Sequence, residues 1–377
     1  RLNGMFAFAI YDKNNNKITI VRDAFGIKPL FYYIDDVKNH FSFSSELPAL
    51  LDLIDISPKL DKQSTFDYLV GQNYDLNEKT FFENICSLLP GEYISFDLNC
   101  TKILSREMWW KPSIIEEKNI SFQNATCKIR DKFLNNINLH LRSDLPIGAA
   151  LSGGIDSSAI VCSIRHLYPD MDIHTFTYVA DEKKIDEEIW ADKVNNHVGA
   201  ISHKIKFKPF DIVNDLDDLI KTQGAPFSST SIYAQFKVFQ EIKRANIKVI
   251  LDGQGADEIL AGYDPYIGAR IKSLIKKGKF IDAIKLFDNW NKKIVRSKRS
   301  SLIVALRPFL SDDYINYFKT YLGKNIYSLV NQRWFSENGV DKLSPERKLN
   351  LNKDELDNRY LSSKLLRTIT SQGLVHL

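Results

Sequence analysis

Apolar positions in the first hundred residues mostly alternate with polar ones, which is the two-residue period of β-strands. Residues 5–10 are almost entirely apolar, residues 17–21 alternate, and residues 12–16 between them are rich in turn formers. This arrangement predicts a β-hairpin, and residues 30–34 and 40–44 predict a second one. A short helix at 47–53 and a further strand at 88–96 complete a region that is typical of an α+β domain.

The pattern changes after residues 107–119, which contain Trp109-Trp110, a proline and mixed charges. Strand-like and helix-like segments then alternate, and this alternation predicts a doubly wound parallel sheet. We therefore expect two domains, one over residues 1–110 and an α/β domain over residues 120–377, with mostly helical structure beyond residue 263. The predicted strands are 147–151, 173–179, 201–207 and 247–251, and the predicted helices are 121–141, 156–167, 186–198, 211–222 and 231–245.

The most informative segment, Leu-Ser-Gly-Gly-Ile-Asp-Ser-Ser at 151–158, lies between a predicted strand and a predicted helix. Its glycines let backbone amides approach an anion, and the helix start adds unpaired N–H groups and the positive end of a dipole. No lysine follows the glycines, so this is not the phosphate loop of kinase-like NTPases. We predict a pyrophosphate-binding loop in which hydroxyls donate hydrogen bonds and a carboxylate holds Mg²⁺. Its residues are Ser152, Gly153, Gly154, Asp156, Ser157 and Ser158.

A second segment rich in Gly and Asp, at 251–258, follows the predicted strand 247–251. Parallel strands place their carboxyl ends at one edge of the sheet, where such folds bind ligands. We therefore expect the two segments to face one crevice. Asp257 is suited to a second Mg²⁺ contact, and the small residues of the segment leave room for a substrate.

Composition places few further limits on function. The 377 residues are 44% hydrophobic and 26% charged, enough for two or three globular domains. The net charge of +4 is small, so a nucleic-acid partner would need a local basic patch. Residues 272–299 are basic, which we interpret as a solvated helical face, with an RNA surface as the alternative.

The cysteines and the apolar runs indicate a cytoplasmic protein. Cys86, Cys100, Cys127 and Cys162 lack metal-ligand spacing, so we interpret them as buried thiols. No apolar run reaches the roughly 18 residues that a membrane span needs. We expect neither a membrane partner nor a nucleic-acid partner, and we leave a homodimer open.

The two segments together resemble the synthetase half of glutamine-hydrolysing asparagine synthetases, and the first is similar to the PP-loop of ATP pyrophosphatases. Residues 1–10, 22–30, 44–46 and 89–92 resemble the later part of the family's class II glutaminase domain. The resemblance covers residues 1–260 well. It implies a partial class II glutaminase α+β domain, followed by a PP-loop ATP-pyrophosphatase parallel-sheet domain that is incomplete at its C-terminus.

The resemblance implies a reaction that uses ATP, Mg²⁺, a carboxylic acid and ammonia derived from glutamine. The acid, aspartate in the family, would be adenylated and then amidated, giving asparagine, AMP and pyrophosphate. A free carboxylate resists nucleophiles, whereas AMP is a good leaving group. Asp156 and Asp257 would bind Mg²⁺, and ATP would contact Leu151, Ser152, Gly153, Gly154, Tyr178, Asp252 and Gly253.

Two departures from the family pattern affect this expectation. Well-known relatives carry a glutamate where Gln254 stands, and a glutamine can hydrogen-bond an intermediate but cannot accept a proton. Either Glu258 or the adenylate phosphate then acts as the base, or the chain acts on another acid. The family's N-terminal cysteine nucleophile is not found in this sequence, so we expect an interior piece that does not itself hydrolyse glutamine.

The sequence therefore allows three functions. The first is a glutamine-dependent asparagine synthetase. The second is a related enzyme that amidates a sugar uronate or a natural-product acid. The glutamine at position 254 is the reason to retain this second function. The third is a noncatalytic or RNA-binding relative, against which the intact Ser-Gly-Gly-Ile-Asp-Ser-Ser segment argues.

Overall fold

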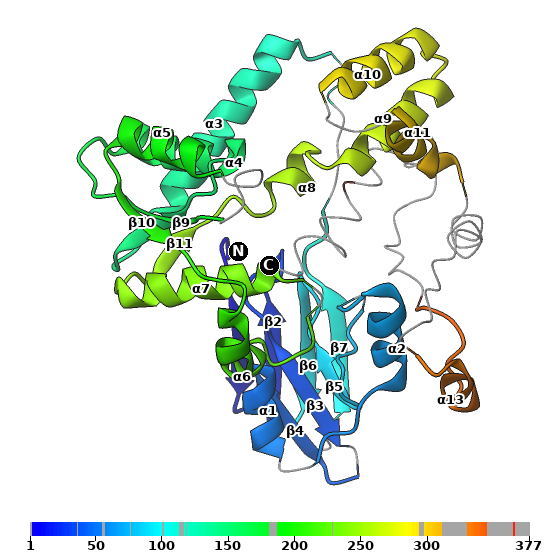
Figure 1. Cartoon of the computed structure of the whole chain (residues 1–377). Helices are drawn as coiled ribbons and strands as arrows, with labels where there is room; N and C mark the ends of the chain where they lie inside the picture. The colour runs from blue at the N-terminus through cyan, green and yellow to red at the C-terminus, as the bar shows by residue number, and fades with distance from the viewer. Residues whose placement is uncertain are drawn as a thin grey trace. The chain divides into compact units, whose positions relative to one another are not determined.

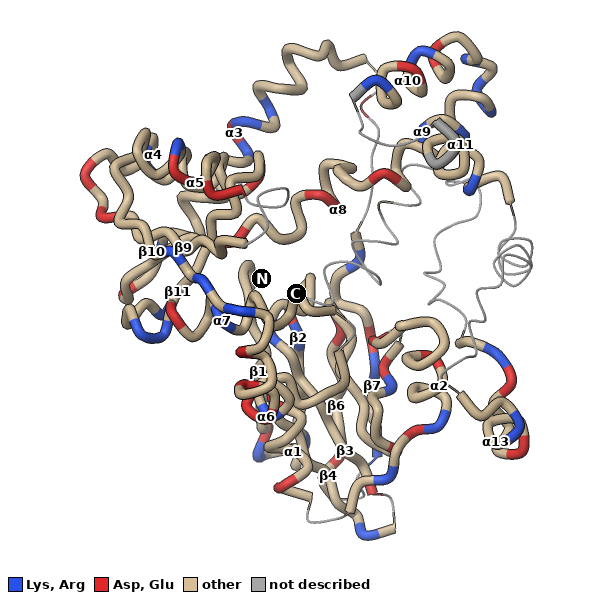
Figure 2. Tube along the Cα trace, in the orientation of Figure 1, with Lys and Arg blue, Asp and Glu red and all other residues tan. Residues whose placement is uncertain are grey.

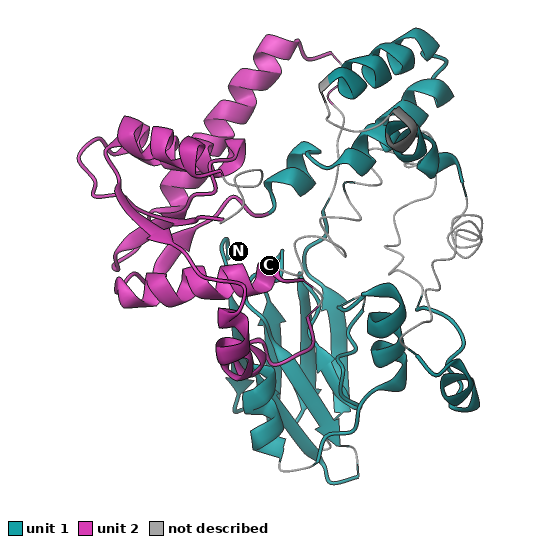
Figure 3. Ribbon diagram, viewed as in Figure 1, with its two compact units in different colours: residues 1–114, 255–377 teal, residues 115–254 magenta. Residues whose placement is uncertain are grey.

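The computed structural model describes residues 2–344, except 36, 55–56, 76, 100–101, 113–116, 118, 181–186, 228, 294–297 and 311–329, and also describes residue 365. It divides into two compact units (Figure 3), and each is described by itself. Unit 1 comprises residues 1–114 and 255–377, and unit 2 comprises residues 115–254. No helix of the described residues is long and apolar enough to cross a bilayer.

Unit 1 contains two antiparallel sheets (Figure 1). One has the order β1 (Ala7–Asp12), β2 (Lys17–Arg22), β6 (Glu92–Asp97) and β7 (Lys102–Met108). The other has the order β4 (His40–Ser44), β3 (Phe31–Asp35) and β5 (Ile85–Ser87). Both predicted hairpins are confirmed, because β1 pairs with β2 and β3 pairs with β4.

A hydrophobic core of residues from both sheets stabilises this part of unit 1. Ile20, Ile94 and Phe96 come from one sheet and Tyr32 from the other, and all four are buried. The predicted short helix is α1 (Leu47–Ile54), which packs against Tyr33 and Ile85 with its buried leucines. Strands β2 and β6 thus turn one apolar face toward the core, as expected, whereas Ile10 and Tyr11 of β1 are each 56% exposed.

Two predictions for unit 1 were wrong, both in segments where turn-forming or polar residues determine the structure. The expected strand 88–96 begins only at Glu92, because Pro90 and Gly91 form a turn and Gly91 has a φ of +69°. Helix α2 (Lys62–Gly71) was not expected, since its apolar positions are few. Its N-cap Asp61 accepts a hydrogen bond from the Ser64 amide, which supplies a start signal.

The helical part of unit 1 follows the residues of the second Gly-rich segment. It contains α8 (Ala256–Leu260), α9 (Asp264–Lys276), α10 (Phe280–Lys293), α11 (Lys298–Leu306) and the 3₁₀ turn Arg307–Phe309. Helix α13 (Gln332–Glu337) packs on α2, with the rings of Phe335 and Phe66 5.1 Å apart. The mostly helical prediction holds for these described residues.

Unit 2 is a doubly wound parallel sheet, as predicted. Its order is β10 (Ile201–Ile205), β9 (His174–Tyr178), β8 (Ile147–Ala150) and β11 (Val249–Leu251), and every pairing is parallel. One face is covered by α3 (Phe122–His140), α4 (Ile155–Leu167) and α5 (Glu188–Val198), and α7 (Ser231–Arg244) covers the other (Figure 1). Helix α6 (Asp211–Gln223) precedes α7 in the chain.

A buried pair of charges organises the loop between β2 and β3. The Asp23 carboxylate, 1% exposed, accepts hydrogen bonds from the amides of Phe6, Phe25, Ile27 and Lys28 at 2.9–3.3 Å. The Arg22 guanidinium donates to the carbonyls of Gly26, Lys28 and Leu88. Burial lowers the pKa of Arg22. The two side chains together satisfy the backbone polar groups of an irregular loop.

We expect Asp23→Asn to lower the free energy of unfolding of the intact protein by about 1–3 kcal/mol, because an amide cannot accept four N–H bonds as the carboxylate does. Urea unfolding followed by circular dichroism measures the change. Asp52→Asn, on the exposed side of α1, is the matched control and should change stability little. Equal stabilities of the two variants would show that the loop does not depend on this carboxylate.

Candidate active site

The first Gly-rich loop leaves the sheet at the carboxyl end of β8. Leu151, the first residue of the loop, is buried, and its amide donates to the Phe176 carbonyl at 2.9 Å. Its own carbonyl accepts a hydrogen bond from Thr177 Oγ1 at 2.8 Å. Both partners belong to β9, so the neighbouring strand fixes where the loop begins. Thr177 was not among the residues predicted to belong to this region.

Gly153 is the residue for which the loop requires glycine. Its φ is +87°, and an added Cβ would lie 2.9 Å from both the Ala191 amide nitrogen and the Glu187 carbonyl oxygen. These backbone atoms belong to the start of α5, which is attached to the sheet by the 2.7 Å hydrogen bond from Thr175 Oγ1 to Asn195. The beginning of α5 therefore forms one wall of the loop, a contact between segments that the sequence analysis did not predict.

Helix α4 begins at the loop with amides that are free to bind an anion. Its N-cap is Gly154, which has no side chain to accept a hydrogen bond. In the part of the chain that the structure describes, the amides of Ile155 and Ser157 have no acceptor. Unpaired amides and the helix dipole together favour a phosphate at this position.

The serines of the loop have different surroundings. Ser157 is buried, and its hydroxyl accepts a hydrogen bond from the Ser152 amide at 3.3 Å and lies 3.1 Å from Ser152 Oγ. Ser152 is exposed, and Ser158 is half-buried in the first turn of α4. Ser157 thus shapes the loop, whereas Ser152 and Ser158 can still reach a ligand.

The second loop lies against the first turn of α4. An added Cβ on Gly253 would lie 3.1 Å from the Ser157 amide nitrogen and 3.3 Å from Asp156 Cβ. A side chain there would cover one of the amides that an anion would use. Residues 253 and 156–157 are thus in contact within unit 2, as their positions after parallel strands β11 and β8 predict.

Asp252 and Gln254 flank this contact. The Asp252 carboxylate accepts hydrogen bonds from the amides of Gly253 and Gln254, yet burial of its carboxyl group raises its pKa. Part of the Asp252 residue and the Gln254 side chain remain exposed to solvent. Both can therefore reach a ligand at the end of β11.

The remaining residues of the second segment belong to unit 1. The Asp257 carboxylate occupies the space beside Gly262, where an added Cβ would lie 1.7 Å from Asp257 Oδ1. Glu258 is 4% exposed, and its Oε1 accepts a hydrogen bond from the Tyr263 hydroxyl at 3.1 Å. Burial and the Glu258 carboxylate raise the pKa of Tyr263 to about 12. Glu258 Oε2 has no partner among the described residues, so it can accept a hydrogen bond from a ligand.

Tyr178 and the metal ligands remain predictions. Tyr178 is the last residue of β9 and is partly exposed to solvent. Its ring stacks on that of Phe207, with the ring centroids 4.7 Å apart. Within the described residues there is no group of three or more His, Cys, Asp or Glu that could hold a metal ion. Asp156 is in unit 2 and Asp257 is in unit 1, and their joint binding of Mg²⁺ stays a prediction.

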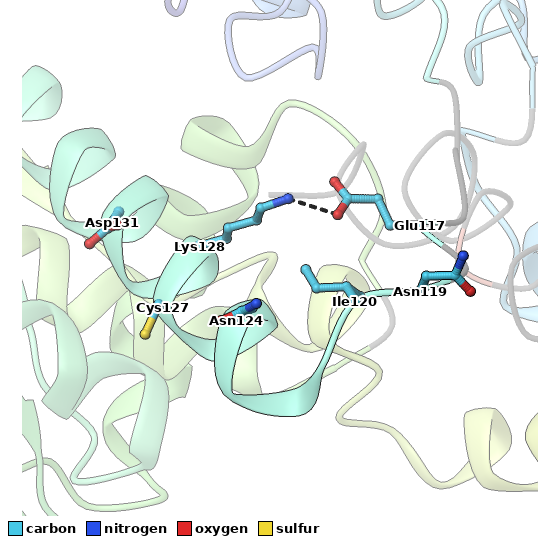
Figure 4. Close-up of a pocket in the computed structure, with 7 residues that line it drawn as sticks. All are labelled: Glu117, Asn119, Ile120, Asn124, Cys127, Lys128 and Asp131. Carbon is cyan, nitrogen blue, oxygen red and sulfur yellow. Dashed lines mark hydrogen bonds and ion pairs between the residues drawn. The ribbon is translucent and has the colours of Figure 1, made fainter.

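A separate shallow pocket lies at the start of α3 (Figure 4). Its lining includes Asn124, Cys127 and Asp131 from the helix and Glu117 from the segment before it. Glu117 already pairs with Lys128 at 2.8 Å, which neutralises the one cation among the described residues that line the pocket. No residue of the predicted site lines this pocket, and we assign no chemistry to it.

Comparison with known proteins adds a family context. The family described as asparagine synthase matches residues 128–358, and a glutamine amidotransferase domain matches residues 1–110. A Methanocaldococcus jannaschii protein assigned as a glutamine-hydrolysing asparagine synthetase is 30% identical over 286 residues, which are 75% of this chain and 54% of the relative. Asparagine synthetase 3 (glutamine-hydrolysing) of Bacillus subtilis is 28% identical over 310 residues, which are 78% of this chain and 49% of that protein.

A third relative has a different name. Amidase chry2 of Gibberella zeae is 25% identical over 281 residues, which are 70% of this chain and 40% of that protein. The chain spans about half the length of the first relatives that it matches.

We expect Gly153→Ala to lower the free energy of unfolding by about 1–3 kcal/mol, because its φ of +87° and the backbone of α5 both oppose a side chain. Gly154→Ala is the matched control, since the φ of Gly154 is −66° and the added Cβ meets only Ser152 Oγ, at 3.2 Å. Urea unfolding of both variants measures the difference. Equal effects of the two substitutions would contradict the proposed wall at α5.

We expect Asp252→Asn to raise the unfolding temperature at pH 7. A carboxyl group whose pKa is raised by folding contributes most to stability at low pH, and that contribution is lost as the pH rises through the pKa of the folded state. The asparagine variant does not lose stability in this way. The difference in unfolding temperature between the variant and the unmodified protein should therefore shrink as the pH falls from 7 toward 4. Thermal unfolding across this range measures it, and a pH-independent difference would contradict the assigned desolvation.

Proposed function

The chain belongs to the asparagine synthase family, and on this premise we propose that it carries the ATP-using site of a glutamine-dependent amide ligase. The observation that carries the proposal is the contact of Gly253 with Asp156 and Ser157. It joins two loops at the carboxyl edge of a parallel sheet, beside the unpaired amides of α4. This arrangement suits a nucleotide triphosphate tail.

The proposed reaction has two steps. A carboxylate oxygen of the acid attacks the α-phosphorus of ATP, and pyrophosphate leaves. Ammonia then attacks the acyl carbon, AMP leaves, and one proton is lost. Amides at the start of α4 would hold the departing pyrophosphate, with Ser152 and Ser158 as further donors.

Mg²⁺ would neutralise charge on the phosphates, and carboxylates are the ligands it prefers. Asp156 lies in the first turn of α4, beside the loop that would hold these phosphates, and Asp257 keeps its proposed role as a second contact. We propose Leu151, Tyr178 and Asp252 as the residues around the rest of the nucleotide. The buried Glu258, with one unpartnered oxygen among the described residues, is the proposed base.

Aspartate is the first candidate for the acid, in keeping with the names of the synthetase relatives. The second candidate is another carboxylate, such as a sugar uronate or a natural-product acid. Gln254 and the similarity to amidase chry2 favour keeping this second candidate. We assign ammonia from glutamine as the nitrogen source, because residues 1–110 match a glutamine amidotransferase domain.

The deciding experiment supplies the intact protein with ATP, Mg²⁺ and ammonium and measures pyrophosphate release with a panel of acids. Aspartate, a sugar uronate and a simple dicarboxylate such as succinate form the core of the panel. Release that depends on one acid supports the ligase and identifies its acceptor. No release with any acid, or release independent of the acid, would contradict the proposed function.

We expect Asp156→Ala to lower acid-dependent pyrophosphate release by about 100-fold or more, because the phosphates lose a metal ligand. Asp170→Ala is the matched control, since Asp170 is an exposed aspartate beyond the other end of α4. The control should retain the activity of the unmodified protein. A fully active Asp156→Ala protein would remove this residue from the site.

A further inference from the structure

One segment of unit 1 carries more positive charge than the whole chain. Residues 264–293 contain eight Lys and Arg and three Asp, a net charge of +5, whereas the entire sequence has a net charge of +4. The segment comprises α9 and α10, which are joined at Gly278 (φ +71°), and Figure 2 marks its cations in blue. Residues 294–297 of the basic stretch identified in the sequence lie outside the described residues.

Four of these eight cations form no ion pair in the described part of the chain. Lys276, Lys279, Lys285 and Lys292 are exposed, and none has a carboxylate within ion-pair distance in the described part of the chain. Lys272 differs, because it donates to the Pro308 carbonyl, and burial and the charge of Lys276 lower its pKa. The charges of these exposed lysines are therefore not neutralised by the described residues, and they attract anions.

Helix α10 has apolar side chains on two sides. Ala283, Leu286 and Phe287 pack into a core with α9 and α11. A second set is exposed, with Phe280, Ile281 and Ile284 at 60%, 69% and 62%. The turn of about 100° per residue in an α-helix places this second set on one arc, which also contains the exposed Asp288, and places Lys285 and Lys292 next to it.

We propose that the α9–α10 hairpin docks peripherally on the surface of an anionic lipid bilayer. Phe280, Ile281 and Ile284 would enter the boundary between headgroups and acyl chains, and the four exposed lysines would contact anionic headgroups. Charge complementarity selects an anionic partner. The two isoleucines favour a bilayer over RNA, because aliphatic side chains gain from an acyl boundary but offer no ring on which a base can stack.

This proposal goes beyond the proposed ligase and does not depend on it. The expectation of no membrane partner rested on the lack of a spanning segment, and a peripheral contact needs none. The surface would bring the protein to a membrane without changing the residues around Gly153 and Gly253.

The test is co-sedimentation of the intact protein with vesicles of phosphatidylcholine alone and with vesicles containing about 30% phosphatidylserine. We expect binding only to the anionic vesicles, with binding that weakens as salt increases. The double variant Lys276→Glu/Lys279→Glu should weaken binding by about 30-fold, and Ile281→Asp should weaken it as well.

Matched controls distinguish an effect on the proposed lipid-binding surface from an effect of net charge or of misfolding. Lys206→Glu/Lys208→Glu makes the same charge change at exposed lysines of unit 2, and Val213→Asp makes the same apolar-to-acid change on α6. Both controls should bind vesicles as the unmodified protein does, and circular dichroism should show all variants folded. No binding to anionic vesicles, equal loss in the controls, or salt-dependent binding of tRNA without vesicle binding would overturn the proposal.

Discussion

Close approach of glycine backbones to helix starts is the constraint on which the proposed site depends. Gly153 touches the beginning of α5, and Gly253 touches the first turn of α4. Any side chain at either position would fill space now occupied by backbone atoms or would cover an amide of α4. The proposed phosphate-binding part of the site would therefore use main-chain amides that the fold already orients.

Sequence periodicity predicted the elements well where one face of each is apolar. Strand β2 and the central parallel strands β8 and β9 of unit 2 are examples, because burial dictates their pattern. Helix α2 was missed, since a polar cap and few apolar residues define it, and the strand expected from residue 88 was overextended through a Pro-Gly turn. The contact of Gly153 with α5 could not be foreseen, because it joins segments whose spacing in space depends on the whole sheet.

Two buried carboxylates of unit 1 differ in how completely folding satisfies their oxygens. The Asp23 carboxylate accepts four amide hydrogen bonds, and these bonds stabilise the loop between β2 and β3. Glu258 is nearly as buried but accepts one hydrogen bond, from Tyr263, and one of its oxygens has no partner among the described residues. A carboxylate that folding leaves incompletely satisfied lowers stability and is usually kept for a ligand or a reaction.

The strand order of unit 2 also bears on how such a protein can diversify. Strands β8 and β11 are neighbours in the sheet, yet the loops that follow them are far apart in the chain. Mutation or recombination can therefore alter the later loop while the earlier one stays intact. Position 254 is one such place, because its exposed glutamine can change without altering the glycine at 253 that contacts the first turn of α4.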